Sequence, residues 1–146
     1  MNYTPINPKK AARQERDREF MQMYRLALEK FIENQVSNAK QAAIEWTIHN
    51  SNPRYHVSYE RAYRVICQII RQGKTPIKPS LQAQMWEEIA ERVRQLMRGR
   101  KASVAQALEF VLEHCRASRF FITSHYAYTT LVDRARHEQA ARRRGA

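Results

Sequence analysis

The sequence predicts an all-α protein built from two tandem three-helix (helix–helix–loop–helix) repeats packed around a shared core. Three observations lead to this prediction. Apolar residues recur at spacings of three and four, which places them on one face of a helix. Only 3 glycines and 5 prolines among 146 residues leave little material for the turns of an all-β fold. The chain also aligns with itself, without a gap, when it is shifted by 65 residues.

The first two predicted helices begin the first repeat. One covers residues 8–34, and its apolar stripe consists of Phe20, Tyr24, Leu28, Phe31 and Ile32. The next is expected to begin after a cap at Ser37 or Asn38 and to continue through His49. Its apolar face would contain Ala39, Ala42, Ala43 and Trp46.

A loop and a third helix complete the first repeat. Residues 50–53 are a cluster of helix breakers, and residues 54–57 are extended in character. Ser58 is the expected cap of a helix that ends at Gly73, because glycine is common just after a helix. The inner face of this helix would contain Ala62, Val65, Ile66, Ile69 and Ile70. Residues 75–79 form a stiff linker, because each proline disfavours helix at the residue before it.

The same order of elements recurs after the linker. Ser80 is the expected cap of a helix that Gly99 stops, Ser103 caps the next helix, and Thr123 caps the last. The first of these helices would bury Met85, Trp86, Ile89, Val93, Leu96 and Met97. The inner faces of the other two would contain Val104, Ala107, Leu108 and Val111, and Ala127, Tyr128, Leu131 and Val132.

A short signature recurs at matching places in the two copies. Residues 54–58 are Arg-Tyr-His-Val-Ser, and residues 119–123 are Arg-Phe-Phe-Ile-Thr. Amphipathic helices alone can be shifted into partial agreement, but an arginine, an aromatic, an aliphatic and a hydroxyl residue at the same places indicate a duplication. This doublet resembles a two-copy pattern in small basic proteins of gut bacteria and their phages. The resemblance implies an architecture and no activity, because that family is uncharacterised.

The predicted organisation follows the two copies. It comprises a basic N-terminal extension (1–17), repeat 1 (18–74), a proline linker (75–79), repeat 2 (80–139) and an arginine-rich tail (140–146). Tyr55 and Phe120 are each expected to fill the core of their own repeat. The residues expected to be largely buried are Phe20, Tyr24, Leu28, Trp46, Val65, Ile66, Trp86, Ile89, Val93, Leu108, Val111 and Leu131.

The charge of the chain indicates a partner of the opposite sign. There are 26 lysines and arginines against 14 aspartates and glutamates, a net charge of +12. Residues 37–79 contribute +5 and residues 117–146 contribute +4, whereas 1–36 and 80–116 contribute only +2 and +1. A charge that served only solubility would not need this concentration, although a solvated basic surface is the alternative. The pattern favours a polyanion as partner.

The third helix of repeat 1 is the leading candidate for contact with nucleic acid. Arg61, Arg64, Gln68 and Arg71 follow one another at spacings of three, four and three, so they share a face opposite the apolar one. Such a helix can enter a major groove or follow phosphates, but the loop before it is too long for a standard helix-turn-helix motif. The expected nucleic-acid contacts are Arg54, Tyr59, Arg61, Arg64, Gln68, Arg71, Arg119, Arg134, Arg136, Arg142, Arg143 and Arg144.

We therefore expect a non-enzymatic nucleic-acid-binding protein, with DNA favoured over RNA. Two copies of a basic third helix would give one chain two contact surfaces, and the arginine-rich tail would act as an auxiliary clamp. The alternative is a structural or adaptor protein, associated with a phage or another mobile element, that docks an acidic protein partner.

Motifs for catalysis and for metal binding are missing from the sequence. It has no glycine-rich phosphate loop, no HExxH and no cysteine pair at metal-ligand spacing, so we expect no catalytic residue, metal or cofactor. Glu87, Glu88 and Glu91 lie near arginines on one helix, which indicates an ion-paired surface. No signal peptide is recognisable, and no apolar run approaches the roughly 20 residues needed to cross a bilayer. With only two cysteines, the chain is predicted to be cytoplasmic and to have no membrane partner.

Overall fold

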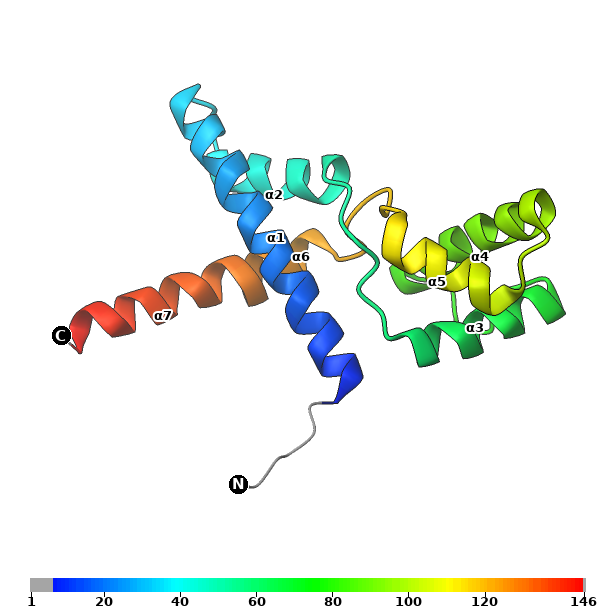
Figure 1. The fold of residues 1–146 in the computed structure, drawn as a ribbon. Coiled ribbons are helices and arrows are strands. Elements are labelled where there is room, and N and C mark those ends of the chain that lie inside the picture. The colour runs from blue at the N-terminus through cyan, green and yellow to red at the C-terminus, as the bar shows by residue number, and fades with distance from the viewer. Residues whose placement is uncertain (1–6, 146) are drawn as a thin grey trace. The chain divides into compact units, whose positions relative to one another are not determined.

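The computed structural model describes residues 7–145, and over this range it contains helices and no strand. The predicted all-α class is therefore confirmed. Residues 1–6 of the predicted basic extension and Ala146 of the predicted tail lie outside the described residues. The elements are α1 (Pro8–Glu33), α2 (Ala39–Asn50), α3 (Tyr59–Gln72), α4 (Leu81–Arg100), α5 (Val104–His114), α6 (Ser124–Tyr126), the π-helix η1 (Ala127–Val132) and α7 (Asp133–Arg144) (Figure 1).

Four helices begin at the caps that the sequence predicts. In each case a side-chain hydroxyl accepts a hydrogen bond from the backbone N–H three residues later, at 3.1 to 3.4 Å. The caps are Ser58, Ser80, Ser103 and Thr123. The predicted cap of α2 is different, because Asn38 is left-handed (φ 56°) and its side chain makes no capping hydrogen bond.

Two glycines were predicted to end helices, and only one of them does so. Gly73 follows α3 with φ 75°, the left-handed conformation that glycine adopts at little cost, as predicted. Gly99 was expected to stop the next helix, but α4 continues through Arg100. The left-handed residue is Lys101, with φ 51°. Glycine permits a helix to end without forcing it to, so one glycine inside a helical pattern does not fix the boundary.

The end of α1 is a left-handed turn without a glycine. The N–H of Val36 donates to the carbonyl of Phe31, and the N–H of Gln35 donates to the carbonyl of Ile32. This pair of hydrogen bonds is a Schellman motif, and it requires a left-handed residue at Gln35, whose φ is 55°. A residue with a Cβ atom is strained in this conformation.

Replacing Gln35 with glycine should therefore stabilise the protein. Relief of the left-handed strain outweighs the entropy that a glycine adds to the unfolded chain, so we expect a gain of about 0.5 to 1 kcal/mol. Gln41→Gly, at an exposed position inside α2, is the control and should cost about 1 kcal/mol. Urea denaturation measures both. If Gln35→Gly destabilises as the control does, residue 35 is not left-handed in solution.

The chain divides into two compact units, and neither is a contiguous segment. Unit 1 consists of residues 7–16 and Asn52–Ala117, and unit 2 consists of Asp17–Ser51 and residues 118–145. α1 therefore contributes its first residues to unit 1 and the rest to unit 2. The units do not coincide with the predicted repeats 18–74 and 80–139.

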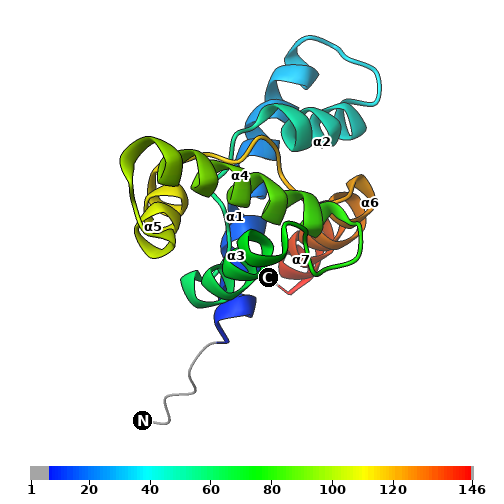
Figure 2. The same ribbon diagram turned by 90° about the vertical axis from the view of Figure 1, so that its right-hand side faces the viewer.

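Unit 1 is centred on a three-helix arrangement in which α3, α4 and α5 all contact one another (Figure 2). Its buried side chains come from each helix and include Ile66, Trp86, Ile89, Val93, Leu108 and Val111, as predicted. Two stretches that flank the helices are joined by hydrogen bonds. The N–H of Ala117 donates to the carbonyl of Pro53 (2.7 Å), and the Asn52 side chain donates to the carbonyl of Ala117 (3.1 Å).

Unit 2 has its own apolar core. It contains Phe20, Tyr24, Ala27, Ala43, Ile44, Ile48, Phe120, Ile122, Ala127 and Leu131. Phe120 packs edge-on against Phe20, with ring centroids 5.3 Å apart. Phe120 here and Tyr55 in unit 1 are both buried, as predicted for the two aromatic anchors. α7 buries no residue, although it continues directly from η1.

The partners of the two third helices differ from the prediction. α3 belongs to predicted repeat 1, yet it contacts α4 and α5 of predicted repeat 2. The last helical segment belongs to predicted repeat 2, yet α6 and η1 contact α2. Hydrophobic periodicity shows which face of a helix is buried but not which other helix covers it, and two similar repeats offer two similar faces.

Three residues predicted to lie on core-facing stripes are exposed, namely Ile32, Trp46 and Tyr128. Trp46 retains 42% of its accessible surface, whereas the buried residues of α2 are Ala43, Ile44, Thr47 and Ile48. α2 has two candidate apolar stripes, one through Ala39, Ala42 and Trp46 and one through Ile44 and Ile48. The second contains the β-branched residues and is the one that faces the core. Leu28 and Val65 are half-buried, so they are less enclosed than expected.

Candidate nucleic-acid interface

The outer face of α3 carries the predicted contacts with nucleic acid. The opposite face is fixed by Ala62, Ile66 and Ile69, which are all buried in unit 1. Arg64 and Arg71 are exposed on the outer face. The helix therefore presents two guanidinium groups to solvent from a rigid, capped element.

Arg64 and Arg71 also have no acidic partner. Within residues 7–145, no carboxylate lies within ion-pair distance of either side chain. The only acidic residue of α3 is Glu60, in its first turn. Glu60 precedes Arg64 by four residues, a spacing at which the two charges attract each other, whereas Arg71 has no acidic residue three or four positions away.

The arginines of α4 provide a contrast. Arg92 pairs with Glu88 (3.7 Å), and Arg94 and Arg98 both pair with Glu91 (3.8 and 3.5 Å). The ion-paired surface predicted from this part of the sequence is confirmed for these residues. Glu87 instead accepts a hydrogen bond from the Thr75 hydroxyl at 2.9 Å. Three of the four arginines of α4 are therefore ion-paired, whereas Arg64 and Arg71 of α3 are not.

Arg61 and Gln68 are less available than the sequence suggests. Both are half-buried. The guanidinium carbon of Arg61 lies 5.8 Å from the centroid of the buried Trp86 ring, a cation–π contact inside unit 1. The basic face is therefore narrower than predicted, and its freely exposed charges are Arg64 and Arg71.

A pair of aromatic side chains borders this face. Tyr59 and Tyr63 are one helical turn apart, with ring centroids 6.1 Å apart and planes inclined by 23°. They retain 42% and 41% of their accessible surface. Tyr59 was predicted as a contact and Tyr63 was not. The spacing of four residues between them was the signal in the sequence that could have identified the pair.

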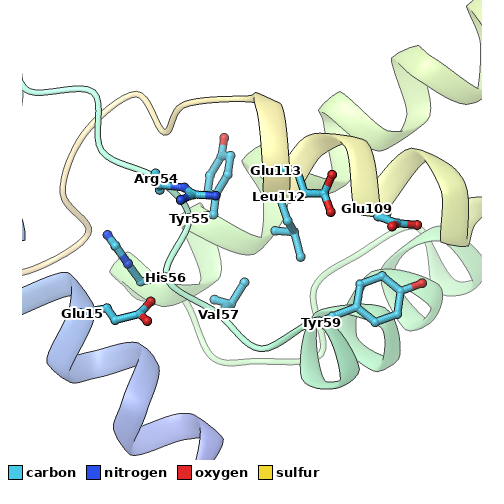
Figure 3. A pocket seen from close by; sticks show the side chains of 9 residues that line it. All are labelled: Glu15, Arg54, Tyr55, His56, Val57, Tyr59, Glu109, Leu112 and Glu113. Carbon is cyan, nitrogen blue, oxygen red and sulfur yellow. The ribbon is translucent and has the colours of Figure 1, made fainter.

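Arg54 lies in a different environment. It lines a cavity of about 290 Å³ in unit 1 with His56, Tyr59 and three carboxylates (Figure 3). The carboxylates are Glu15, Glu109 and Glu113, and Figure 3 shows Glu109 and Glu113 on the same wall, contributed by α5. Three negative charges disfavour a phosphate here, so Arg54 is a weaker candidate than the arginines of α3.

Of the contacts predicted in the second half of the chain, two arginines interact with other groups of the protein and four are exposed on α7. Arg119 donates to the backbone carbonyls of Phe120 (3.0 Å) and Ile122 (3.4 Å), so it supports the chain locally. Arg134 pairs with Glu138 on α7 (3.3 Å). The remaining arginines are exposed on α7, namely Arg136, Arg142, Arg143 and Arg144.

The sequence analysis missed an apolar groove in unit 2. It has a volume of about 300 Å³ and is lined by Met23, Leu26, Ala27, Lys30, Phe31, Asn34 and Trp46. Leu26, which lines this groove, retains 58% of its accessible surface, a large exposed fraction for a leucine. The exposed Trp46 forms part of this groove. The signal in the sequence was the presence of large apolar residues outside the buried stripe of each helix, such as Leu26 on α1 and Trp46 on α2.

Comparison with known proteins yields no match among family models, curated proteins or solved structures. The resemblance to the two-copy family of small basic proteins therefore stays a prediction. Among residues 7–145, no helix is both long and apolar enough to span a bilayer. The same residues contain no group of three or more histidine, cysteine, aspartate or glutamate side chains placed to hold a metal ion.

Proposed function

We propose that this protein binds nucleic acid, without catalysing a reaction on it, through the outer face of α3. One observation carries the proposal: Arg64 and Arg71 are exposed and have no carboxylate partner among the described residues, on a helix whose other face is buried. Arginine matches the geometry of phosphate oxygens better than lysine does. DNA is the first ligand to test.

The distribution of charge between the units supports this choice of face. The segments of unit 1 contain 16 lysines and arginines against 7 aspartates and glutamates, whereas those of unit 2 contain 10 against 7. A polyanion is therefore attracted mainly to unit 1. The exposed arginines of α7 would add an auxiliary contact, because arginines that neutralise phosphates release counterions.

A duplication of the helix–loop–helix segment remains part of the proposal, but it does not duplicate the binding face. Buried positions match at a shift of 65, as with Tyr55 and Phe120, Ala62 and Ala127, and Ile66 and Leu131. The positions that match Arg61, Arg64, Gln68 and Arg71 are Tyr126, Thr129, Asp133 and Arg136. The second copy thus keeps the packing and lacks most of the positive charge, so we assign binding to α3.

The test is a pair of double variants that remove the same charge. Arg64→Ala/Arg71→Ala removes the two unpaired arginines of α3, and Arg94→Ala/Arg98→Ala removes two that are paired on α4. Binding to a fluorescently labelled DNA, single-stranded and duplex, is followed by anisotropy between about 50 and 200 mM salt. The α3 variant should bind more weakly and should lose about two units of salt slope, roughly one for each phosphate contact. The α4 variant should change the slope little.

Equal losses in both variants would show that only net charge matters and that α3 has no special role. Unchanged binding of the α3 variant at every salt concentration would show that its outer face is solvated surface. Circular dichroism should give the same helix content for all three proteins, because none of the four arginines is buried.

The apolar groove of unit 2 favours a second candidate function, docking of another protein. Apolar grooves of this kind accept the apolar face of an amphipathic helix. Lys30 is the only charged residue that lines the groove, so an acidic residue beside the apolar face of the partner would be matched. If the parent protein binds neither DNA nor RNA at low salt, this adaptor function becomes the leading proposal.

A further inference from the structure

Two tyrosines of α3, Tyr59 and Tyr63, lie outside the buried core of unit 1. The contacts of α3 with α4 and α5 are made on the side of Ala62, Ile66 and Ile69, which are buried. Tyr59 and Tyr63 remain outside that core, each with about two fifths of its surface open to solvent. Their rings are nearly parallel and offset, with centroids 6.1 Å apart and planes inclined by 23°.

The Tyr59 ring lies against α5, and the Tyr63 ring lies beside it. The Tyr59 hydroxyl lies 3.5 Å from the carbonyl oxygen of Ala105, near the start of α5, which is at the outer limit for a hydrogen bond. The i, i+4 spacing brings the Tyr63 ring alongside it. A preformed pair of aromatic faces costs a ligand little ordering when it stacks on them.

Charges on either side of the tyrosine pair determine on which side of it the phosphate backbone of a bound strand would lie. Glu109 and Glu113 line the cavity beside Tyr59, where they repel phosphates (Figure 3). Arg64 and Arg71 lie further along α3 and attract phosphates. Arg71 follows Tyr63 by eight residues, or about 12 Å along the helix. A strand whose base stacks on the tyrosines would therefore have its backbone on the arginine side.

We propose that α3 binds single-stranded nucleic acid in preference to duplex, with bases stacked on Tyr59 and Tyr63 and phosphates held by Arg64 and Arg71. This inference rests on the proposed function and specifies its ligand. Bases in a duplex stack on one another and do not offer their faces to a protein, whereas an unpaired strand does. Aromatic platforms beside basic residues are the usual means of binding single strands without sequence preference.

The experiment measures how tightly three variants bind two ligands. Two of the variants are double substitutions and one is a single substitution, and the ligands are an oligothymidine strand and a blunt DNA duplex of the same length. Tyr59→Leu/Tyr63→Leu removes the aromatic faces but keeps apolar bulk and helix propensity. Tyr59→Phe/Tyr63→Phe keeps the faces and removes the hydroxyls. Phe110→Leu removes another exposed aromatic of unit 1, which retains 39% of its surface on α5, and is the control.

The leucine pair should weaken binding to the single strand by about 5- to 150-fold, the range for the loss of one stacked base. Its affinity for duplex and its salt slope should stay the same, because the phosphate contacts are intact. The phenylalanine pair and Phe110→Leu should bind both ligands as the parent does. Thermal melts followed by circular dichroism check that every variant is folded.

Two outcomes would overturn the inference while the proposed function stands. One is a parent protein that binds duplex as tightly as the single strand, with no change on the leucine substitutions. The other is an equal loss with phenylalanine and leucine, which would assign the effect to the hydroxyl groups and not to stacking. A parent that binds neither ligand at low salt would instead contradict the proposed function itself.

Discussion

Replacing Phe120 with alanine should lower the free energy of unfolding by about 3 to 5 kcal/mol, the usual cost of deleting a buried aromatic ring. Phe120 retains only 1% of its accessible surface and packs edge-on against Phe20. Its backbone N–H also donates to the carbonyl of Ile48, which fixes the ring between the two segments of unit 2. The cavity left by the ring cannot collapse without moving both segments.

Trp46→Ala is the matched control in the same unit. The sequence predicts both aromatics to be buried, but Trp46 is substantially exposed. Its loss should cost roughly half as much, about 1.5 to 2.5 kcal/mol, because about two fifths of its surface stays in water and gains nothing from burial. Urea unfolding followed by circular dichroism measures both variants. If the two substitutions cost a similar amount, Phe120 and Trp46 do not differ in burial in solution as they do in the structure.

Stability should fall steeply at alkaline pH because of Tyr55. Burial raises the pKa of Tyr55 well above its ordinary value, and the hydrogen bond that its hydroxyl donates to Glu88 at 2.8 Å adds to the effect. Below about pH 10 the residue is protonated in both the folded and the unfolded protein. Above that pH the unfolded state releases the proton and the folded state does not. Each further pH unit should therefore cost about 1.4 kcal/mol.

Tyr55→Phe should remove this part of the pH dependence. At neutral pH it should cost only about 1 kcal/mol, the net contribution of a lost hydrogen bond. Between about pH 9 and pH 12, however, the parent should lose roughly 2 to 3 kcal/mol more than the variant. Urea unfolding at several pH values tests this, with Tyr59→Phe as the control at an exposed tyrosine. Parallel pH profiles for the parent and Tyr55→Phe would contradict the assignment.

Local features of this fold could be predicted from the sequence because their causes are local. A serine or threonine three residues before a free backbone N–H can cap a helix wherever that helix packs, so Ser58, Ser80, Ser103 and Thr123 were all identified. The ion pairs of α4 follow in the same way from spacings of three and four. Such predictions need no knowledge of the tertiary structure.

Features that depend on distant residues could not be predicted in this way. Which of two apolar stripes of α2 is buried depends on what packs against it, and Trp46 was therefore misplaced. The exposure of Tyr63 and the cation–π contact of Arg61 with Trp86 arise because α3 packs against α4. For the candidate site, the sequence identified the arginines but not which of them other residues engage.

The order in which the chain leaves the ribosome matters for a protein whose units are interleaved. Most of unit 1 comes from one continuous stretch, Asn52–Ala117, and can assemble as soon as that stretch has emerged. The α1–α2 part of unit 2 is made earlier but lacks Phe120, Ile122 and Leu131 until residues 118–131 have been made. At usual elongation rates this wait lasts roughly 4 to 16 seconds. During that interval the apolar side of α2 is uncovered, so nascent chains are most exposed to aggregation and to chaperones before residues 118–131 have been made.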